Sequence, residues 1–186
     1  SRQVSVLTTT QIAAFNSLQI SVIESRDLIA LTSAQVDALD TAQLSAITTS
    51  QIAALTSSQI RVVDKFTTDQ IVALSSVQIA ALTSTQVQAL DSTQVTVIET
   101  RDITALSTAQ IVAMTTTSAS SLVSEQIAVL KTAQVAAFLT SQLAGWSSTQ
   151  IDTLSSTQIS SLTTRQIAAL DTAQAVAIKS QNMSAL

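Results

Sequence analysis

The chain has 186 residues, of which 46% are hydrophobic and only 11% charged, and its net charge is −4. It contains no cysteine, histidine or tyrosine and a single glycine, which excludes disulfides, thiolate metal sites, Ser-His-Asp or Cys-His catalysis and glycine-rich phosphate loops. The charges are few and scattered, which argues against nucleic-acid binding. Ser, Thr and Gln interrupt every apolar cluster well before the roughly 20 residues that a membrane-spanning helix needs.

One eight-residue phrase organises the chain. It is clearest at 51–58, Gln-Ile-Ala-Ala-Leu-Thr-Ser-Ser, and its positions are numbered here from 0 at the Gln to +7. Copies start at every eighth residue from 3 to 59 and, after three inserted residues, from 70 to 182, so 23 copies fill the chain. We therefore expect a single tandem-repeat array over 1–186, a fragment of a longer protein, with the insertion at about 64–66 and a degenerate repeat at 118–125.

The spacing of apolar residues within the phrase predicts a short helix in each copy. Positions +1 and +4 are almost always large and apolar, three residues apart, and +3 is mostly Ala or Val, whereas +2 varies freely and points away from the stripe. The Ser/Thr-rich positions +5 and +6 suit a helix N-cap, and Thr48 to Gln51 matches the Ser/Thr-x-x-Gln capping box. Either +5 or +6 could be the cap. We expect an all-α solenoid, or superhelix, of about 23 octapeptide repeats with one very short helix per repeat.

Two other architectures remain open. A β-solenoid would use the strand preference of Ile, Val and Thr, although the many Ala residues and the near absence of Gly and Pro count against its corners. A continuous helix would rotate its apolar stripe by about 80° per repeat, and the Ser/Thr pairs would weaken it at each copy.

Four features, one of them present twice, depart from the pattern. The insertion Asp64–Phe66 is close to one helical turn, so we expect a helix longer by a turn, with Phe66 packed inward. The sequence Val-Ile-Glu-Ser/Thr-Arg-Asp at 22–27 and again at 97–102 indicates a solvated ion-pair network, or alternatively a small partner site. The repeat that begins Ser118-Ala119 loses most of its core and should be the weakest. Trp146, beside Gly145, is the one place where a groove could open, although the aromatic residues are core fillers first.

The Gln column is the only uniform polar position. Gln occupies position 0 in 19 copies, and its replacements, Asp27, Asp102, Ser118 and Asn182, are all polar. Because this position falls inside the apolar stripe, the amide must be hydrogen-bonded, either in the capping box or in an amide ladder with the next coil. Both roles are structural, so we predict no catalytic, cofactor-binding or metal-binding residue, no cofactor and no enzymatic activity.

The phrase Leu82-Thr83-Ser84-Thr85-Gln86-Val87-Gln88-Ala89 resembles the Ser/Thr/Ala/Gln-rich octapeptide tracts of long secreted or surface proteins of Gram-negative bacteria. The resemblance implies an extracellular or cell-surface spacer, stalk or scaffold of the adhesin-like kind. The alternatives are a solenoid that binds a protein, peptide or glycan, a cell-surface partner or a second copy of itself, and an ice-binding hydroxyl ladder, which would require the β-solenoid. The partner itself is unknown from the sequence.

Overall fold

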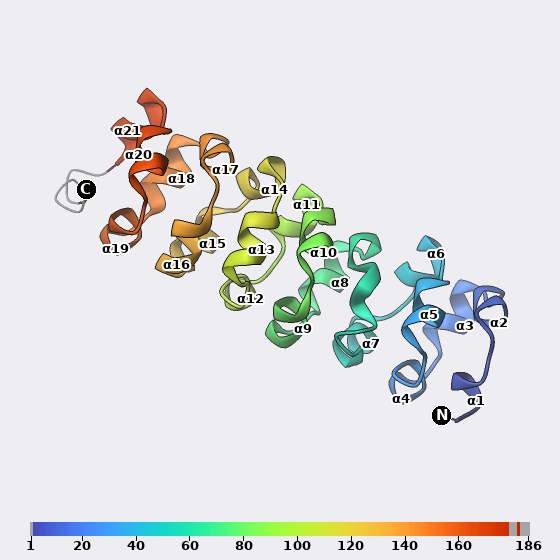
Figure 1. The fold of residues 1–186 in the computed structure, drawn as a ribbon. Coiled ribbons are helices and arrows are strands. Elements are labelled where there is room, and N and C mark those ends of the chain that lie inside the picture. The colour runs from blue at the N-terminus through green and yellow to red at the C-terminus, as the bar shows by residue number, and fades with distance from the viewer. Residues whose placement is uncertain (1, 179–181, 183–186) are drawn as a thin grey trace. The chain divides into compact units, whose positions relative to one another are not determined.

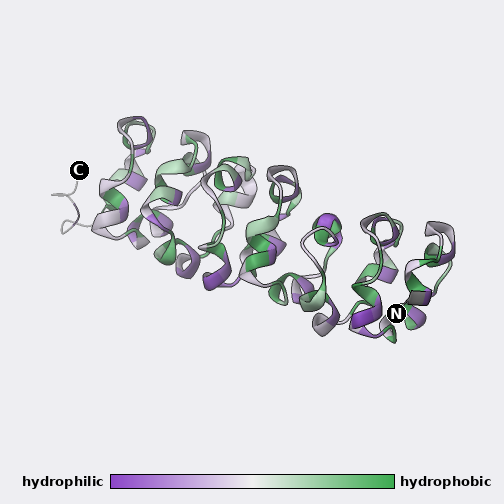
Figure 2. Cartoon of the chain, turned by 60° about the horizontal axis from the view of Figure 1, so that its bottom comes forward, coloured by the Kyte–Doolittle hydropathy of each residue, from purple (hydrophilic) through white to green (hydrophobic). Residues whose placement is uncertain are grey.

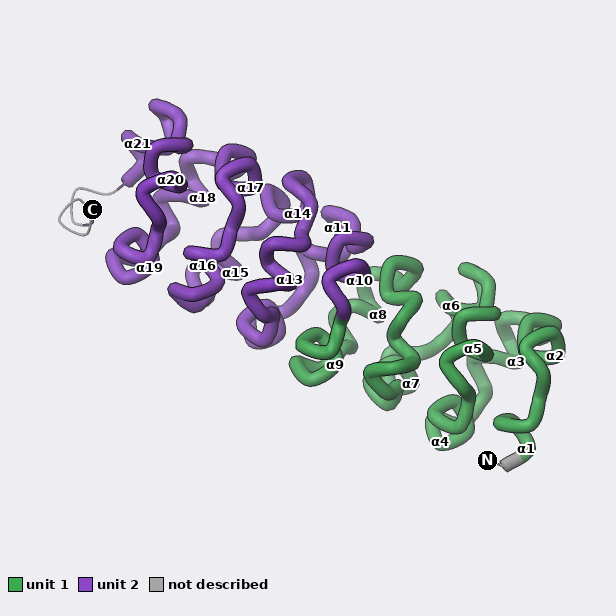
Figure 3. The backbone as a smooth tube through the Cα atoms, viewed as in Figure 1, with its two compact units in different colours: residues 1–82 green, residues 83–186 purple. Residues whose placement is uncertain are grey.

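The computed structural model describes residues 2–178 and 182, and this part of the chain is built of short helices without a strand (Figure 1). Helices three apart along the chain pack against one another in a repeating way, so the all-α solenoid is confirmed. Contacts group the chain into two compact units, Ser1–Leu82 and Thr83–Leu186, which are described separately below (Figure 3). The expectation of one uninterrupted array over 1–186 stays a prediction.

Each described repeat up to residue 178 forms one helical segment of four to six residues. In the first unit these are α1 (Arg2–Ser5), α2 (Thr9–Ala13), α3 (Ser17–Ser21), α4 (Ser25–Leu28), α5 (Ser33–Asp37), α6 (Thr41–Ser45), α7 (Thr49–Ala54), η1 (Ile60–Lys65), α8 (Thr68–Val72) and α9 (Ser76–Ala81). In the second unit they are α10 (Ser84–Ala89), α11 (Ser92–Thr96), α12 (Thr100–Ile103), α13 (Thr108–Ala113), α14 (Thr116–Ser120), α15 (Ser124–Val129), α16 (Thr132–Ala137), α17 (Thr140–Ala144), α18 (Ser148–Thr153), α19 (Ser156–Ser160), α20 (Thr164–Ala168) and α21 (Thr172–Ala177).

Position +5 is the N-cap of the helix that follows it. Thr48, before α7, has an extended backbone, and its side chain accepts a hydrogen bond from the backbone N–H of Gln51. The Gln51 side chain in turn accepts one from the backbone N–H of Thr48 at 2.6 Å, which completes the capping box. Position +5, and not +6, is therefore the N-cap, and the Ser or Thr at +6 is the first helical residue.

Within each unit, the solenoid turns once in slightly fewer than four repeats. Each helix packs side by side with the helix three positions later in the chain, as α2 does with α5 and α14 with α17. Away from the insertion, the Gln side chains that bond to another coil reach back to the end of the fourth repeat before their own, as Gln126 does to Ile98. One turn of the coil therefore holds between three and four repeats.

The two large apolar positions form a continuous core inside each coil. At +1, Ile52 is fully buried, and at +4, Leu55 is 4% exposed. The free position +2 is exposed, as at Ala53, and +3 is mostly half-buried at the margin of the stripe. Apolar and polar colours accordingly alternate within the short helices in Figure 2. The predicted inner and outer faces are confirmed.

The insertion forms a tight 3₁₀ segment, η1, rather than an α-helix extended by one turn. Val62 sits inside η1 with φ −97° and ψ 26°, which is not helical, so the segment bends there. Phe66, at its end, is 4% exposed and packs inward as predicted. The prediction of a longer α-helix is wrong, because the non-helical backbone at Val62 interrupts the segment and leaves only short stretches with the i→i+3 geometry.

The extra residues also change which repeats are neighbours. Gln70 donates to the carbonyls of Leu44 and Ile47, both at 2.7 Å, and Gln78 donates to those of Ile52 and Leu55. Both acceptor pairs lie three repeats back instead of four. Consistently, α8 packs against α7, two repeats earlier. The longer repeat thus takes up enough of the coil that one repeat fewer completes the turn.

We predict that deleting Asp64–Phe66 restores the four-repeat pairing. The deletion leaves Gln59-Ile60-Arg61-Val62-Val63 followed directly by Thr67, which is a regular octapeptide. Gln70 should then donate to the carbonyls of the repeat that starts at Gln35. A crystal structure of the variant would show the exchange; continued pairing of Gln70 with Ile47 would mean that the insertion is not its cause.

Candidate functional site

The most regular polar feature is a ladder of buried glutamine amides, here called the glutamine ladder. Gln126 is 1% exposed, and its Oε1 accepts a hydrogen bond from the backbone N–H of Val123 at 2.9 Å. Its Nε2 donates to the carbonyls of Val95 at 2.9 Å and Ile98 at 2.7 Å, in the coil before. The amide therefore joins the start of one helix to the end of another. Capping box and inter-coil ladder, posed as alternatives, occur together.

The same geometry recurs in both units. Glutamine Nε2 atoms donate to carbonyls of the preceding coil at positions 35, 43, 51, 59, 70, 78, 126, 134, 142, 150, 158, 166 and 174. A helix of five residues leaves most of its backbone donors and acceptors without intrahelical partners. Because each amide serves both ends, an apolar substitution there would strand several buried groups.

Shorter side chains keep only part of this arrangement. Ser118 is 2% exposed, and its hydroxyl donates to the carbonyl of Leu90 at 2.8 Å. The Ser118 hydroxyl also accepts a hydrogen bond from the Thr115 hydroxyl at 2.9 Å. In regular repeats, the glutamine Oε1 accepts instead from the backbone N–H of the N-cap residue. Asn182 donates to the carbonyl of Leu154 at 3.1 Å. The degenerate repeat still folds as a regular helix, α14; its expected weakness stays a prediction.

The two Val-Ile-Glu-Ser/Thr-Arg-Asp segments form local, exposed ion pairs. Arg26 lies 2.5 Å from Glu24, and Arg101 lies 2.8 Å from Glu99. Both arginine side chains are more than half exposed, so solvent screens the pairs and each contributes little to stability. Asp102 itself is buried, with Arg101 Nε at 3.4 Å. The geometry agrees with the solvated-network interpretation.

Trp146 fills the core instead of opening a groove. It is 3% exposed, and its indole N–H donates to the carbonyl of Ala119 at 3.1 Å. Its ring meets Phe138 edge to face, with centroids 5.0 Å apart. A Cβ on Gly145 would come within 3.2 Å of the Thr116 side chain, so the small residue lets α17 approach α14 closely. The indole packs against the one interior repeat whose +1 residue is Ala.

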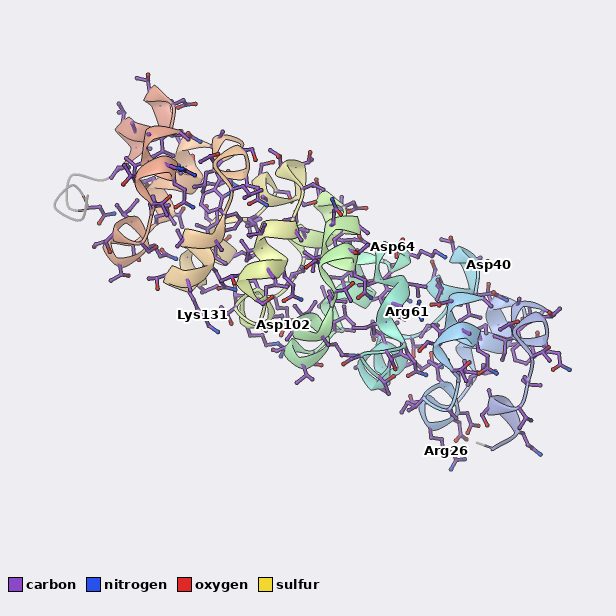
Figure 4. The ribbon with its side chains drawn as sticks, viewed as in Figure 1. Arg26, Asp40, Arg61, Asp64, Asp102 and Lys131 are labelled. Carbon is purple, nitrogen blue, oxygen red and sulfur yellow. The ribbon has the colours of Figure 1, made fainter. Side chains whose placement is uncertain are left out.

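No other constellation in the described residues suggests chemistry. They contain no group of three or more His, Cys, Asp or Glu that could hold a metal ion. None of their helices is long and apolar enough to cross a membrane. The labelled charges in Figure 4, such as Arg26, Asp40 and Lys131, are spread along each unit instead of gathering. An ion pair between neighbouring coils joins Arg61 of η1 and Asp37 of α5 at 3.6 Å.

Asp91 is the one carboxylate with a clear shift of pKa. As the N-cap of α11, it accepts a hydrogen bond from the Thr93 hydroxyl at 2.6 Å and another from the Gln94 backbone N–H at 2.9 Å. Both bonds favour the charged carboxylate, so they lower the pKa of Asp91 below its ordinary value of 3.8, with the Thr93 bond the larger cause.

We predict that Gln158→Glu destabilises the fold by several kcal/mol. The glutamate keeps the size and the acceptor for the N–H of Ser155. It replaces a donor with a charged acceptor facing the carbonyls of Ile127 and Leu130, each 2.9 Å from the present Nε2. A buried charge that is left without a compensating partner costs about 3–5 kcal/mol. The matched control is Gln11→Glu, at an exposed amide, which should stay within about 0.5 kcal/mol of the parent. Equal losses in urea melts would refute the ladder as an energetic element.

We also predict that the benefit of aspartate over asparagine at position 91 depends on pH. A carboxylate whose pKa is lower in the folded chain stabilises it fully above the unfolded pKa, and this stabilisation disappears as the pH falls through the folded pKa. The unfolding free energy of the parent minus that of Asp91→Asn should therefore decrease as the pH is lowered below about 4. Urea melts from pH 7 to pH 2 measure this difference, in which the other acids cancel. A difference independent of pH would contradict the prediction.

Comparison with known families identifies the repeat. A family model described as the ALTTAQ repeat matches residues 20–57, 63–97, 95–132 and 127–164, which is more than half of the chain. The segment Ala105-Leu106-Ser107-Thr108-Ala109-Gln110 differs from the sequence ALTTAQ only at Ser107. It spans position +3 of one copy to position 0 of the next. No curated protein matches the chain. The narrower resemblance to tracts of Gram-negative bacteria stays a prediction. The chain belongs to the ALTTAQ repeat family.

Proposed function

We propose that the array is a structural spacer or scaffold of a secreted or cell-surface protein, with length and shape as its contribution and no catalytic activity. The observation that carries this proposal is the use of the glutamine ladder. Its amides are the uniform buried polar groups of the repeat, and they are hydrogen-bonded to the backbone. Gln134, for example, bonds to the backbone of Lys131, Ile103 and Leu106. An amide that is already bonded at both ends is not left over for a ligand.

The exposed column at +2 supports the same proposal. It holds Ala53, Arg61, Val72 and Gln88 among others, and its chemistry changes from copy to copy apart from short runs of Ala (128, 136, 144) and Thr (96, 104). A binding solenoid would present one kind of side chain along a face, so that a ligand meets the same chemistry in each coil. The secreted or surface location rests on the sequence resemblance alone. Ice binding is not proposed, because it required strands and the described residues are helical.

A spacer should depend on the number of repeats and not on the identity of their exposed residues. We predict that deletion of residues 126–157, four whole repeats, leaves a folded array in which Gln158 occupies the place of Gln126 and donates to Val95 and Ile98. Neighbouring helices pack at about 8–10 Å, so the second unit should shorten by about one such layer. Small-angle scattering measures the length, and circular dichroism measures the retained helix.

The matched control keeps the length and changes the surface. Residues 126–157 are replaced by four copies of the octapeptide at 51–58, which keeps an apolar residue at every core position, with Leu in place of Phe138 and Trp146, and preserves the capping box and the glutamine ladder. In the parent protein, a spacer predicts full function for this replacement and a graded loss for the deletion. Loss of function in both variants would instead favour a discrete binding site in these repeats. Antibody labelling of intact cells tests the surface location separately.

A further inference from the structure

The glutamine ladder skips one repeat in the first unit. Gln59 donates to the carbonyl of Leu31 at 2.8 Å, and the next glutamine, Gln70, donates to that of Ile47 at 2.7 Å. The carbonyl of Leu39, between these two acceptors, has no hydrogen-bond donor among the described residues. Leu39 is 2% exposed, and a buried carbonyl without a donor is uncommon in a folded protein. This group is here called the skipped carbonyl.

The insertion offers two ways to complete the turn at this point. Elsewhere in the ladder, a glutamine and its +4 acceptor are 28 residues apart, as Gln59 and Leu31 are. Gln70 and Ile47 are only 23 residues apart, although the insertion lies between them. Gln70 and Leu39 are 31 residues apart. The observed pairing is thus shorter than the regular spacing, and the pairing with the skipped carbonyl is longer.

We propose that the first unit has a second winding, in which Gln70 and Gln78 each bond one repeat earlier in the chain. Gln70 then donates to the skipped carbonyl of Leu39, and Gln78 takes over the carbonyl of Ile47. The carbonyl of Leu55, which Gln78 serves in the present winding, loses its donor instead. Because every repeat offers the same phrase, the number of ladder bonds is equal in the two windings.

The two windings differ in the place of α8 and α9 on the coil. In the present winding α8 packs against α7. In the second it packs against α6, three helices earlier, which is the regular arrangement of this solenoid. Since one turn holds between three and four repeats, α8 and α9 move around the coil by more than a quarter of a turn, and the three extra residues form a bulge. The insertion is therefore a joint with two positions, and it does not depend on the spacer role.

Engineered disulfides distinguish the two windings, because the chain has no cysteine of its own. A Cβ on Gly145 would lie 3.4 Å from the Cβ of Ser120. The +3 residue of a helix and the +2 residue of the helix packed before it are therefore within reach of a disulfide, which needs Cβ atoms about 3.5–4.5 Å apart. In the present winding these residues are Ala73 of α8 and Ala53 of α7. In the second winding they are Ala73 and Ser45 of α6.

We expect the variant Ala53→Cys with Ala73→Cys to close its disulfide fastest under mild oxidation. Ser45→Cys with Ala73→Cys should close more slowly, because the second winding is a minor state, populated at about 0.1–10%. The matched control is Asp37→Cys with Ala73→Cys, which neither winding brings together. It should close at least about tenfold more slowly than the Ser45 variant. Mass spectrometry of timed samples measures each rate, and equal rates for the Ser45 and Asp37 variants overturn the proposal.

Deletion of Asp64–Phe66 supplies the positive control. Without the insertion, α8 should pack against α6 in the regular way. In this background the Ser45 variant should close fastest, and the Ala53 variant should slow to the level of the Asp37 control. Circular dichroism of each reduced variant checks that the helices are retained. If the Ser45 variant fails to close even in the folded deletion background, the pairing that defines the second winding does not exist, and the proposal is overturned.

Discussion

One buried and fully hydrogen-bonded glutamine amide in most repeats makes this fold possible. Helices of five residues are far below the length at which a helix is stable by itself, and most of their backbone groups lie outside the intrahelical ladder. Glutamine is the side chain that fits between two such ends, because it accepts at Oε1 and donates twice at Nε2. Gln142 does this for Leu139, Ile111 and Met114. Asparagine is shorter, glutamate cannot donate, and serine has one proton.

The remaining positions follow from this bridge. The amide has to lie within the coil, so +1 and +4 beside it must exclude water, and their burial in both units does so. Where the +5 cap has no acceptor, as at Val123, Lys131 and Leu139, the glutamine half of the capping box persists. In these copies the side-chain cap is therefore dispensable, whereas the hydrogen bond from the N-cap backbone N–H to the glutamine amide is kept. Stability is distributed over contacts between successive coils, as in other one-dimensional repeats.

Sequence reasoning reached the helix in each repeat and both faces of that helix, because spacing and capping are local properties. It also required hydrogen-bond partners for the glutamines, since a polar group in an apolar stripe must have them. It could not choose +5 over +6, because Val123, Lys131 and Leu139 are poor caps at +5 whereas +6 is Ser or Thr in these copies too. It could not assign the acceptor carbonyls, because these depend on how many repeats complete a turn. The insertion was misread for the same reason: its three residues equal one helical turn locally, but their effect is on the coil. Trp146 was assigned to the core, yet its partner Ala119 lies 27 residues away.

Near-identical repeats raise the question of how the chain finds a unique alignment. A glutamine amide fits the carbonyl pair of any repeat equally well, so a coil displaced by one whole repeat would keep nearly all of its hydrogen bonds. Competing alignments of similar energy roughen a folding landscape. The pairing of Trp146 with Ala119 breaks this degeneracy, because an indole shifted by one repeat would meet the larger Ile111 on one side or Ile127 on the other. The least regular repeat of the array thus specifies the alignment, because only one alignment places the indole of Trp146 against the small Ala119. Identical repeats could not make this distinction.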